Sequence, residues 1–232
     1  MAGDVSLRQN ARHGVDRAGR DADVFALDES RVLRRYRHEG RSTCLESRLM
    51  THLAANGYPV PKVYEVTDTD MVLERLTGPT MLEALAQRPW QVRSLGRALG
   101  RLHHRLHALS APAWLPKRFG TAGNDRVLHL DLHPGNVVLT AHGPVVIDWS
   151  NARAGDPAAD VAMTIVTVGS ADVPGVVARL GRGLLLRAVQ GSCGTDPASR
   201  LQQALNIKLA DPNLTATEAA WLRNRAAVSA GP

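Results

Sequence analysis

Apolar and polar residues follow one another over the first third of the chain in a pattern that predicts a small sheet with one helix. Four short segments rich in β-branched and other apolar residues are typical of strands, and they cover residues 24–27, 31–36, 62–66 and 71–74. The polar residues 28–30 separate the first two strands and predict a hairpin. Residues 43–56 instead repeat leucine at helical spacing, and Gly57 predicts the end of this helix.

From about residue 80 onward, the apolar residues recur at helical spacing. The leucines from Leu95 to Leu106 form the apolar stripe of a long helix. Four later helices are predicted at residues 158–169, 174–190, 198–209 and 215–228. The pattern therefore predicts an α+β fold with two lobes, a β-rich lobe over residues 1–76 and a helical lobe over residues 77–232.

The formal net charge of +6 raises the question of an anionic partner. Basic residues are spread along the chain and interleaved with acids, even in residues 8–41, where arginine is densest. This arrangement is typical of a solvated surface, so we expect no nucleic-acid partner. No apolar stretch is long enough to span a bilayer and the N-terminus lacks a secretion signal, so we expect no membrane partner either.

Cysteine usage is typical of a reducing compartment. Only Cys44 and Cys193 are present, too few for a disulfide framework or a cysteine-rich metal site. Together with the absence of a signal region, this predicts a cytoplasmic protein. The sequence leaves the oligomeric state open.

Three polar residues stand out among short apolar runs in the middle of the chain. Residues 137–139 and 145–147 are β-branched runs separated by a turn, which predicts a tight hairpin. Because a hairpin begins and ends on the same side, we expect Asn136 and Asp148 to come together, with Asp131 on the loop just before them. Two carboxylates and one amide oxygen are hard ligands, so the pattern predicts a Mg²⁺ site.

The motif His129-x-Asp131-x-x-x-x-Asn136, followed by Asp148, resembles the catalytic loop and metal-binding aspartate of the protein-kinase-like superfamily. Three segments resemble the aminoglycoside phosphotransferase and choline kinase branch of that superfamily. They are His-Leu-Asp-Leu-His-Pro-Gly-Asn, the Ile-Asp-Trp that follows it and the later Gly-Asp-Pro-Ala-Ala-Asp. The likeness extends more weakly over nearly the whole chain. It implies a two-lobed protein-kinase-like fold and a kinase that acts on small molecules.

The resemblance also implies a role for each polar group of the motif. Asp131 would accept or orient the proton of the attacking hydroxyl, while Asn136 and Asp148 would hold Mg²⁺ on the nucleotide phosphates. The nucleotide is expected to be ATP, and GTP remains open. Phosphoryl transfer has a loose transition state, so positioning and charge neutralisation would carry most of the catalysis.

In the first lobe, the resemblance implies a phosphate-binding cation with an acidic partner. Arg34 lies where the superfamily carries its phosphate-binding lysine, and Glu46 lies where the ion-pair partner of that lysine is found. Arg35 is the neighbouring candidate, and only one of the two arginines can face the nucleotide because side chains alternate across a strand. Arginine is a departure from the family, since the two cations are not interchangeable at a phosphate.

The connector between the lobes, at about residues 74–77, is expected to hold the nucleotide base by resemblance to the family's hinge. This gives Glu74 and Leu76 as nucleotide-binding positions, through their backbone groups. A glycine-rich phosphate loop is not evident. Gly14 and Gly19 form no persuasive pattern and are equally consistent with a plain turn.

His129 is grouped with Asp131 at the catalytic loop, where we expect it to brace the loop by hydrogen bonds rather than to carry a proton. Asp160 is a candidate partner for it, and an exposed position on its own helix is the alternative for Asp160. Asp156 followed by Pro157 is an ordinary helix start, with aspartate as the N-cap and proline in the first turn.

His103 and His107 stand four residues apart on a predicted helix, which is the spacing of two zinc ligands on one face. No glutamate general base and no cysteine accompany them, and Leu102 and Leu106 mark this helix as a core element. We therefore interpret the two histidines as packing or capping residues rather than as a metal site.

The acceptor is expected to be a small molecule with a hydroxyl group. A polycationic aminoglycoside would favour an acidic pocket, yet beyond residue 157 the chain carries five acidic and seven basic residues. A neutral or mildly charged metabolite is therefore the preferred interpretation. A protein kinase is disfavoured, because no Ala-Pro-Glu segment and no recognisable activation loop follow Asp148.

A catalytically silent, kinase-like regulator that binds nucleotide is the alternative function. Arg34 and the poor glycine loop favour this alternative. The expected convergence of Asp131, Asn136 and Asp148 opposes it, because clustering such groups is costly without a ligand or a partner.

Overall fold

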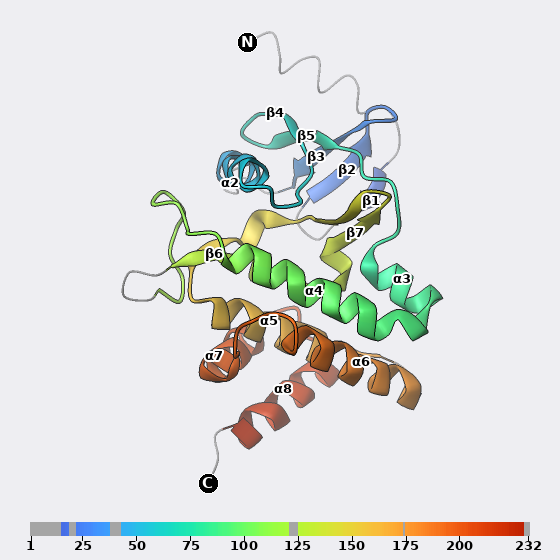
Figure 1. Cartoon of the computed structure of the whole chain (residues 1–232), viewed down its shortest axis with the longest axis vertical. Coiled ribbons are helices and arrows are strands. Elements are labelled where there is room, and N and C mark those ends of the chain that lie inside the picture. Colours follow the sequence, from blue (N-terminus) through green and yellow to red (C-terminus); the bar gives the residue numbers. More distant parts are fainter. Residues whose placement is uncertain (1–14, 19–21, 38–42, 121–124, 174, 230–232) are drawn as a thin grey trace. The chain divides into compact units, whose positions relative to one another are not determined.

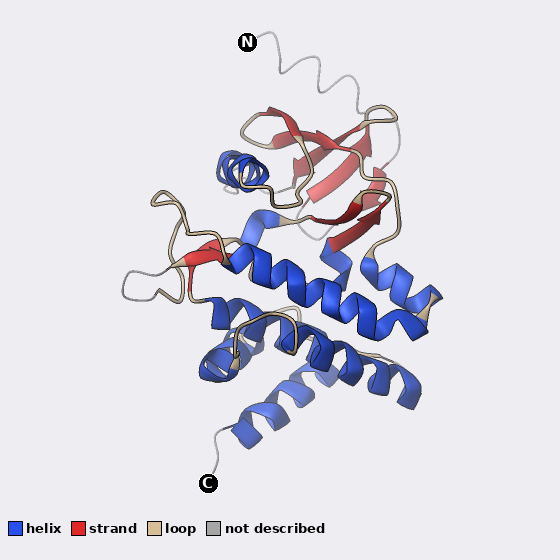
Figure 2. Ribbon diagram, in the orientation of Figure 1, coloured by secondary structure: helices blue, strands red, loops and turns tan. Residues whose placement is uncertain are grey.

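The computed structural model describes residues 15–18, 22–37, 43–120, 125–173 and 175–229. The chain forms two compact units. Unit 1 takes residues 1–78 and 138–150, and unit 2 takes residues 79–137 and 151–232. Strands predominate in unit 1 and helices in unit 2 (Figure 1 and Figure 2).

An antiparallel sheet with the strand order β1-β2-β3-β5-β4 forms most of unit 1. Its strands are β1 (Val15–Ala18), β2 (Ala22–Ala26), β3 (Arg31–Tyr36), β4 (Val63–Val66) and β5 (Asp70–Glu74). Asp28 closes the turn between β2 and β3, because its Oδ1 accepts hydrogen bonds from the backbone N–H and the hydroxyl of Ser30, both at 2.8 Å. The hairpin predicted over these two strands is confirmed.

One helix, α2 (Thr43–Ala55), packs against β4 and β5. It is followed by Gly57, which has a φ of +72°, the left-handed conformation that glycine adopts without strain. The core of unit 1 consists of buried apolar side chains from the sheet and the helix, namely Leu33, Leu49, Met50, Leu53, Met71 and Val72. The predicted arrangement of strands with one helix is confirmed.

A second hairpin contributes to unit 1 from residue 138 onward. It consists of β7 (Val137–Thr140) and β8 (Gly143–Val146), and the short 3-10 helix η3 (Trp149–Asn151) follows it. The N–H of Val146 donates to the carbonyl oxygen of Pro59 at 2.9 Å, and the ring of Trp149 packs edge-on against Tyr58. The lobe division at residues 1–76 and 77–232 stays a prediction, and the compact units differ from it by taking 138–150 into the first unit.

Unit 2 is mostly helical, with one small two-stranded sheet. Its helices are α3 (Met81–Gln87), η1 (Pro89–Gln91), α4 (Val92–His107), η2 (Pro134–Asn136), α5 (Pro157–Ser170), α6 (Gly175–Gln190), α7 (Ala198–Leu209) and α8 (Ala216–Ser229). The strands β6 (Arg126–Leu128) and β9 (Arg153–Gly155) pair antiparallel. Helix α4 packs along α6 and α5 packs along α7 (Figure 1).

Glycines on α4 permit its close approach to α6. A Cβ added at Gly96 would stand 2.8 Å from the Cβ of Ala188 and 2.8 Å from the carbonyl oxygen of Leu185. A Cβ added at Gly100 would stand 2.6 Å from the carbonyl oxygen of Val189. Only glycine therefore fits at these two positions without moving α6.

The four helices predicted after residue 157 are confirmed to within two residues at each end that the structure describes. Helix α3 is not among the predicted helices, although Thr80 and Glu83 form a capping box, which is a helix-start signal visible in the sequence. Strands β6 and β9 were missed as well, because three-residue strands are too short to show a period. Among the described residues, no helix is both long and apolar enough to span a membrane.

Candidate active site

The predicted catalytic loop follows β6 in unit 2 and leads into η2. Leu130 and Leu132 on either side of Asp131 are buried, whereas the side chain of Asp131 is 31% exposed. Leu130 has a φ of +63°, a left-handed conformation that costs an L-residue about 1–2 kcal/mol. The two buried leucines thus anchor the loop and leave the carboxylate between them accessible.

Asn136 lies against Asp131. Its Nδ2 donates to the carbonyl oxygen of Asp131 at 2.9 Å and to the carboxylate Oδ2 at 3.3 Å. Within the described part of the chain, the Oδ1 of Asn136 accepts no hydrogen bond. The amide therefore orients the base candidate with its nitrogen and keeps its oxygen available for a cation.

Two histidines border the same carboxylate. The N–H of Asp131 donates to Nδ1 of the fully buried His129 at 3.2 Å, which fits a residue that braces the loop. The Nδ1 of His133 accepts from the N–H of Gly135 at 3.0 Å, so a neutral His133 carries its proton on Nε2, and this atom is 3.8 Å from Oδ1 of Asp131. His133 belongs to the quoted motif, but sequence reasoning gave it no role.

A buried carboxylate organises the predicted phosphate-binding region of unit 1. Glu46 is 3% exposed and accepts hydrogen bonds from Nη1 of Arg34, from the hydroxyl of Tyr36 and from the N–H of Trp149. Burial raises the pKa of Tyr36, and the charge of Glu46 adds to this effect. The predicted partners Arg34 and Glu46 are thus in contact, and their role toward a nucleotide stays a prediction.

Arg34 also reaches the predicted metal-binding aspartate. Its Nη2 donates to Oδ1 of Asp148 at 2.8 Å, and the hydroxyl of Ser150 donates to the same oxygen at 3.1 Å. Burial alone would lower the pKa of Arg34, but the carboxylates of Glu46 and Asp148 outweigh it and raise this pKa above its usual value. The guanidinium is therefore permanently charged between two carboxylates.

Arg35 forms its ion pair with a different carboxylate. Its Nε and Nη2 bind the two carboxylate oxygens of Asp70 at 2.9 and 2.7 Å in a bidentate pair. Because neighbouring strand residues point to opposite faces, Arg34 and Arg35 separate as expected. Of the two candidates, Arg34 is the one that contacts other predicted site residues.

The remaining nucleotide-binding positions lie at the end of β5 and just after it. The carboxylate of Glu74 accepts a hydrogen bond from the N–H of Lys62 at 3.1 Å, and Leu76 is half-buried. Their contact with a base stays a prediction. Gly14 and Gly19 lie outside the described residues.

Asp156 and Asp160 have separate structural roles on α5. Asp156 caps the helix by accepting from the N–H of Ala158 at 2.9 Å, with Pro157 in the first turn, as predicted. The alternative of an exposed Asp160 is wrong, because this residue is fully buried. Its Oδ1 accepts from the N–H of Leu130 at 2.6 Å, while the suggested pairing with His129 stays a prediction.

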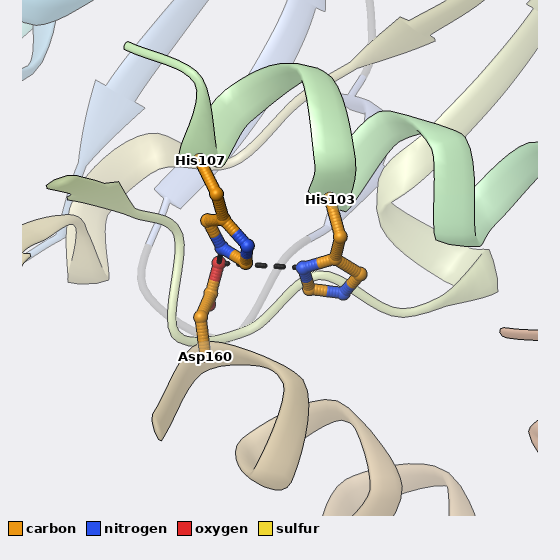
Figure 3. A group of neighbouring side chains, drawn as sticks. All are labelled: His103, His107 and Asp160. Carbon is orange, nitrogen blue, oxygen red and sulfur yellow. Dashed lines mark hydrogen bonds and ion pairs between the residues drawn. The ribbon is translucent and has the colours of Figure 1, made fainter. Parts of the chain in front are cut away.

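His103 and His107 of α4 point toward Asp160 of α5 (Figure 3). Both histidines are buried, as expected for a core helix. The Nε2 of His107 is 2.9 Å and the Nδ1 of His103 is 3.4 Å from Oδ2 of Asp160. The hydrogen bonds with these imidazoles hold the pKa of Asp160 well below its usual value, against the opposing effect of burial.

Comparison with protein families identifies the chain. A model of the phosphotransferase enzyme family matches residues 15–122 and 105–198. The chain belongs to this family. The resemblance stated from the motif is thereby confirmed, whereas a comparison with curated proteins finds no match.

Solved structures share the fold of this phosphotransferase family member at low sequence identity. Aminoglycoside phosphotransferase APH(4)-Ia is 16% identical, with a TM-score of 0.64 and coverage of 98% of this chain and 97% of that chain. The choline/ethanolamine kinase family protein from Mesorhizobium loti is 18% identical, with a TM-score of 0.60 over 99% and 94% of the two chains. APH(2'')-IIa in its streptomycin and ATP complex is 16% identical, with a TM-score of 0.62 over 87% and 85%. The α+β, protein-kinase-like fold class is confirmed.

Proposed function

We propose that this phosphotransferase moves the γ-phosphate of ATP to a hydroxyl group of a small molecule, with Asp131 as the catalytic base. The observation that carries the proposal is the setting of Asp131, whose backbone is fixed by buried neighbours and whose carboxylate is oriented by Asn136. Family membership and the nucleotide complexes of related folds support it, since one such structure contains ATP and another contains ADP.

In the proposed step, the acceptor hydroxyl gives its proton to the carboxylate of Asp131. Its oxygen then bonds to the γ-phosphorus while the bond from that phosphorus to the bridging oxygen breaks and ADP leaves. The Nδ2 of Asn136 lies nearer Oδ2, so Oδ1 is the oxygen we assign to the substrate proton. The Nε2–H of His133 faces this Oδ1 from 3.8 Å and would stabilise its negative charge before transfer.

We further propose Asn136 and Asp148 as the residues that hold Mg²⁺. Their donor set fits a hard cation, because both residues offer oxygen ligands. Asp148 offers a carboxylate, and Asn136 offers an amide oxygen, since its hydrogen bonds to Asp131 are made by the amide nitrogen. When bound, Mg²⁺ would neutralise charge on the nucleotide phosphates.

For the nucleotide itself, we propose that Arg34 contacts the phosphates and that Glu46 fixes this arginine. The buried pair between the two residues supports this assignment, because a guanidinium held by one carboxylate is oriented for a second anion. Glu74 and Leu76 are proposed to meet the base through their backbone groups. ATP is preferred over GTP on the related complex that contains ATP.

The acceptor we favour is a neutral or mildly charged hydroxylated metabolite. Related folds include enzymes for aminoglycosides, a macrolide phosphotransferase and a choline/ethanolamine kinase family protein, so the fold accepts varied substrates. The excess of basic over acidic residues beyond residue 157 disfavours a polycation.

The proposal is tested by incubating the full chain with Mg²⁺, ATP or GTP, and a panel of sugars, amino alcohols, macrolides and aminoglycosides. Mass spectrometry should detect an acceptor heavier by one phosphoryl group, and omission of Mg²⁺ should abolish that product. Binding of nucleotide with Mg²⁺ but no product from any acceptor would favour the silent regulator instead.

A further inference from the structure

Four polar side chains are buried together between α4 and α5, and the proposed reaction does not use them directly. His103, Asp160 and Thr164 are at most 1% exposed, and His107 is 8% exposed. Figure 3 shows both imidazoles of α4 directed at the carboxylate of α5. Buried polar groups destabilise a fold unless they are hydrogen-bonded, so their protons and partners can be assigned.

The hydrogen bonds of Thr164 determine which ring nitrogen of His103 carries a proton. The hydroxyl of Thr164 donates its only proton to the carbonyl oxygen of Leu132 at 2.7 Å. It must therefore accept from Nε2 of His103, which lies 3.0 Å away, so this nitrogen carries a proton. Burial lowers the pKa of His103, although Asp160, whose Oδ2 lies 3.4 Å from Nδ1 of this histidine, opposes the effect of burial.

The carboxylate of Asp160 determines which ring nitrogen of His107 carries a proton. Its carboxylate is ionised and can only accept, so Nε2 of His107 donates to Oδ2 at 2.9 Å. The other oxygen, Oδ1, accepts from the N–H of Leu130 at 2.6 Å. His107 is thus linked to the catalytic loop through one carboxylate.

The two links reach the loop on opposite sides of the base. One ends at the N–H of Leu130 and the other at the carbonyl oxygen of Leu132, and Asp131 lies between them. Leu130 has the left-handed φ of +63°, a conformation that persists only when its surroundings hold it. The strained backbone next to Asp131 is therefore held by α5, and α5 by two histidines of α4.

We propose that His103 and His107 are positioning residues for phosphoryl transfer, acting through Thr164 and Asp160 to hold the backbone of residues 130–132. This inference rests on the proposed function of Asp131. His103, His107 and Asp160 also have the composition of a metal site, and their ligand atoms lie within 4.8 Å of one another. The 2.9 Å between Nε2 of His107 and Oδ2 of Asp160 is the distance of a hydrogen bond, which favours a proton over an ion between these two atoms.

The test compares variants that keep or remove each N–H donor. Glutamine places an amide N–H near the position of Nε2, so His103→Gln and His107→Gln should retain kcat within about threefold. His103→Leu and His107→Leu should lower kcat by about tenfold to a hundredfold, with KM for both substrates within about twofold, because the base is misplaced while binding is kept. Thr164→Val, which keeps the side-chain shape, should behave like His103→Leu. His104→Leu, at an exposed position on the same helix, is the matched control and should behave as wild type.

A second readout does not need activity, so it separates failure of this inference from failure of the proposed function. Amide hydrogen exchange at residues 130–132 should be at least tenfold faster in the two leucine variants and in Thr164→Val than in wild type. Unchanged exchange and unchanged kcat in these variants would overturn the inference. One bound equivalent of zinc per purified chain, lost in the glutamine variants, would also overturn it and would assign a metal site.

Discussion

Arg34 donates a hydrogen bond to Asp148 at 2.8 Å, although 114 residues separate the two along the chain. The same guanidinium is bound by the buried Glu46. The proposed phosphate-binding cation therefore contacts the proposed metal-binding aspartate within unit 1. This contact links β3 to the segment after β8.

Arg34→Met should destabilise unit 1 strongly, because it leaves the carboxylate of Glu46 buried without its cation. We expect the free energy of unfolding in urea to fall by about 3–5 kcal/mol in Arg34→Met. The free energy of unfolding of Arg34→Lys should fall by less, because lysine keeps the positive charge. Arg37→Met is the control, since the pair of Arg37 with Asp23 is open to solvent and should contribute far less to stability than the buried pair. Equal losses in Arg34→Met and Arg37→Met would contradict this account of Glu46.

Asp148→Asn should weaken the response to Mg²⁺ more than it weakens the fold. The amide oxygen can still accept from Arg34, but it lacks the charge that attracts the cation. A Mg²⁺ titration of phosphoryl transfer should show a half-saturating concentration at least about tenfold higher than in wild type. The exposed Asp172→Asn serves as the control, and an unshifted titration in Asp148→Asn would remove this residue from the metal site.

The buried His103 should make stability fall as the solution becomes acidic. Its pKa in the folded chain lies below the usual value of 6.5, so below pH 6.5 the unfolded chain binds a proton that the folded chain does not. The free energy of unfolding should therefore decrease as pH falls below 6.5, with a slope of at most about 1.4 kcal/mol per pH unit from this residue. Urea unfolding of His103→Gln should lack this part of the slope, whereas His104→Gln should keep it.

Gly96→Ala should destabilise unit 2, because the added methyl group would collide with Ala188 and with the carbonyl oxygen of Leu185. We expect a loss of about 1–3 kcal/mol in the free energy of unfolding. The matched control is Gly181→Ala on α6, where a Cβ has no neighbour within 4 Å among the described residues. That variant should gain about 0.5–1 kcal/mol from helix propensity alone, and a loss there of the same size as at Gly96 would contradict the packing argument.

Sequence reasoning predicted the elements well wherever the signal was local. The helix starting at Pro157 was predicted because its cap and first proline are adjacent in sequence, and the β2–β3 hairpin because Asp28 and Ser30 form its turn. Helix α3 has an equally local signal in the capping box of Thr80 and Glu83.

Partners that are distant in sequence could not be predicted in the same way. The position of Arg34 suggested Glu46 only through resemblance, and nothing in the hydrophobic pattern indicates its bond to Asp148. For Asp160, an exposed face was one alternative and it is wrong, because the residue is buried against His103 and His107, while the pairing with His129 stays a prediction. Which carboxylate a buried histidine meets depends on how α4 crosses α5, and periodicity within one helix does not contain that information.

In the proposed reaction, Asp131 performs the chemistry while other groups bind the nucleotide. The most direct test is single-turnover transfer by Asp131→Asn and wild type on the best acceptor, with nucleotide affinity measured in parallel. We predict a rate lower by a factor of about 10² to 10⁴, with nucleotide affinity and the unfolding midpoint unchanged. A variant that transfers phosphate at the wild-type rate would contradict the assignment of Asp131 as the catalytic base.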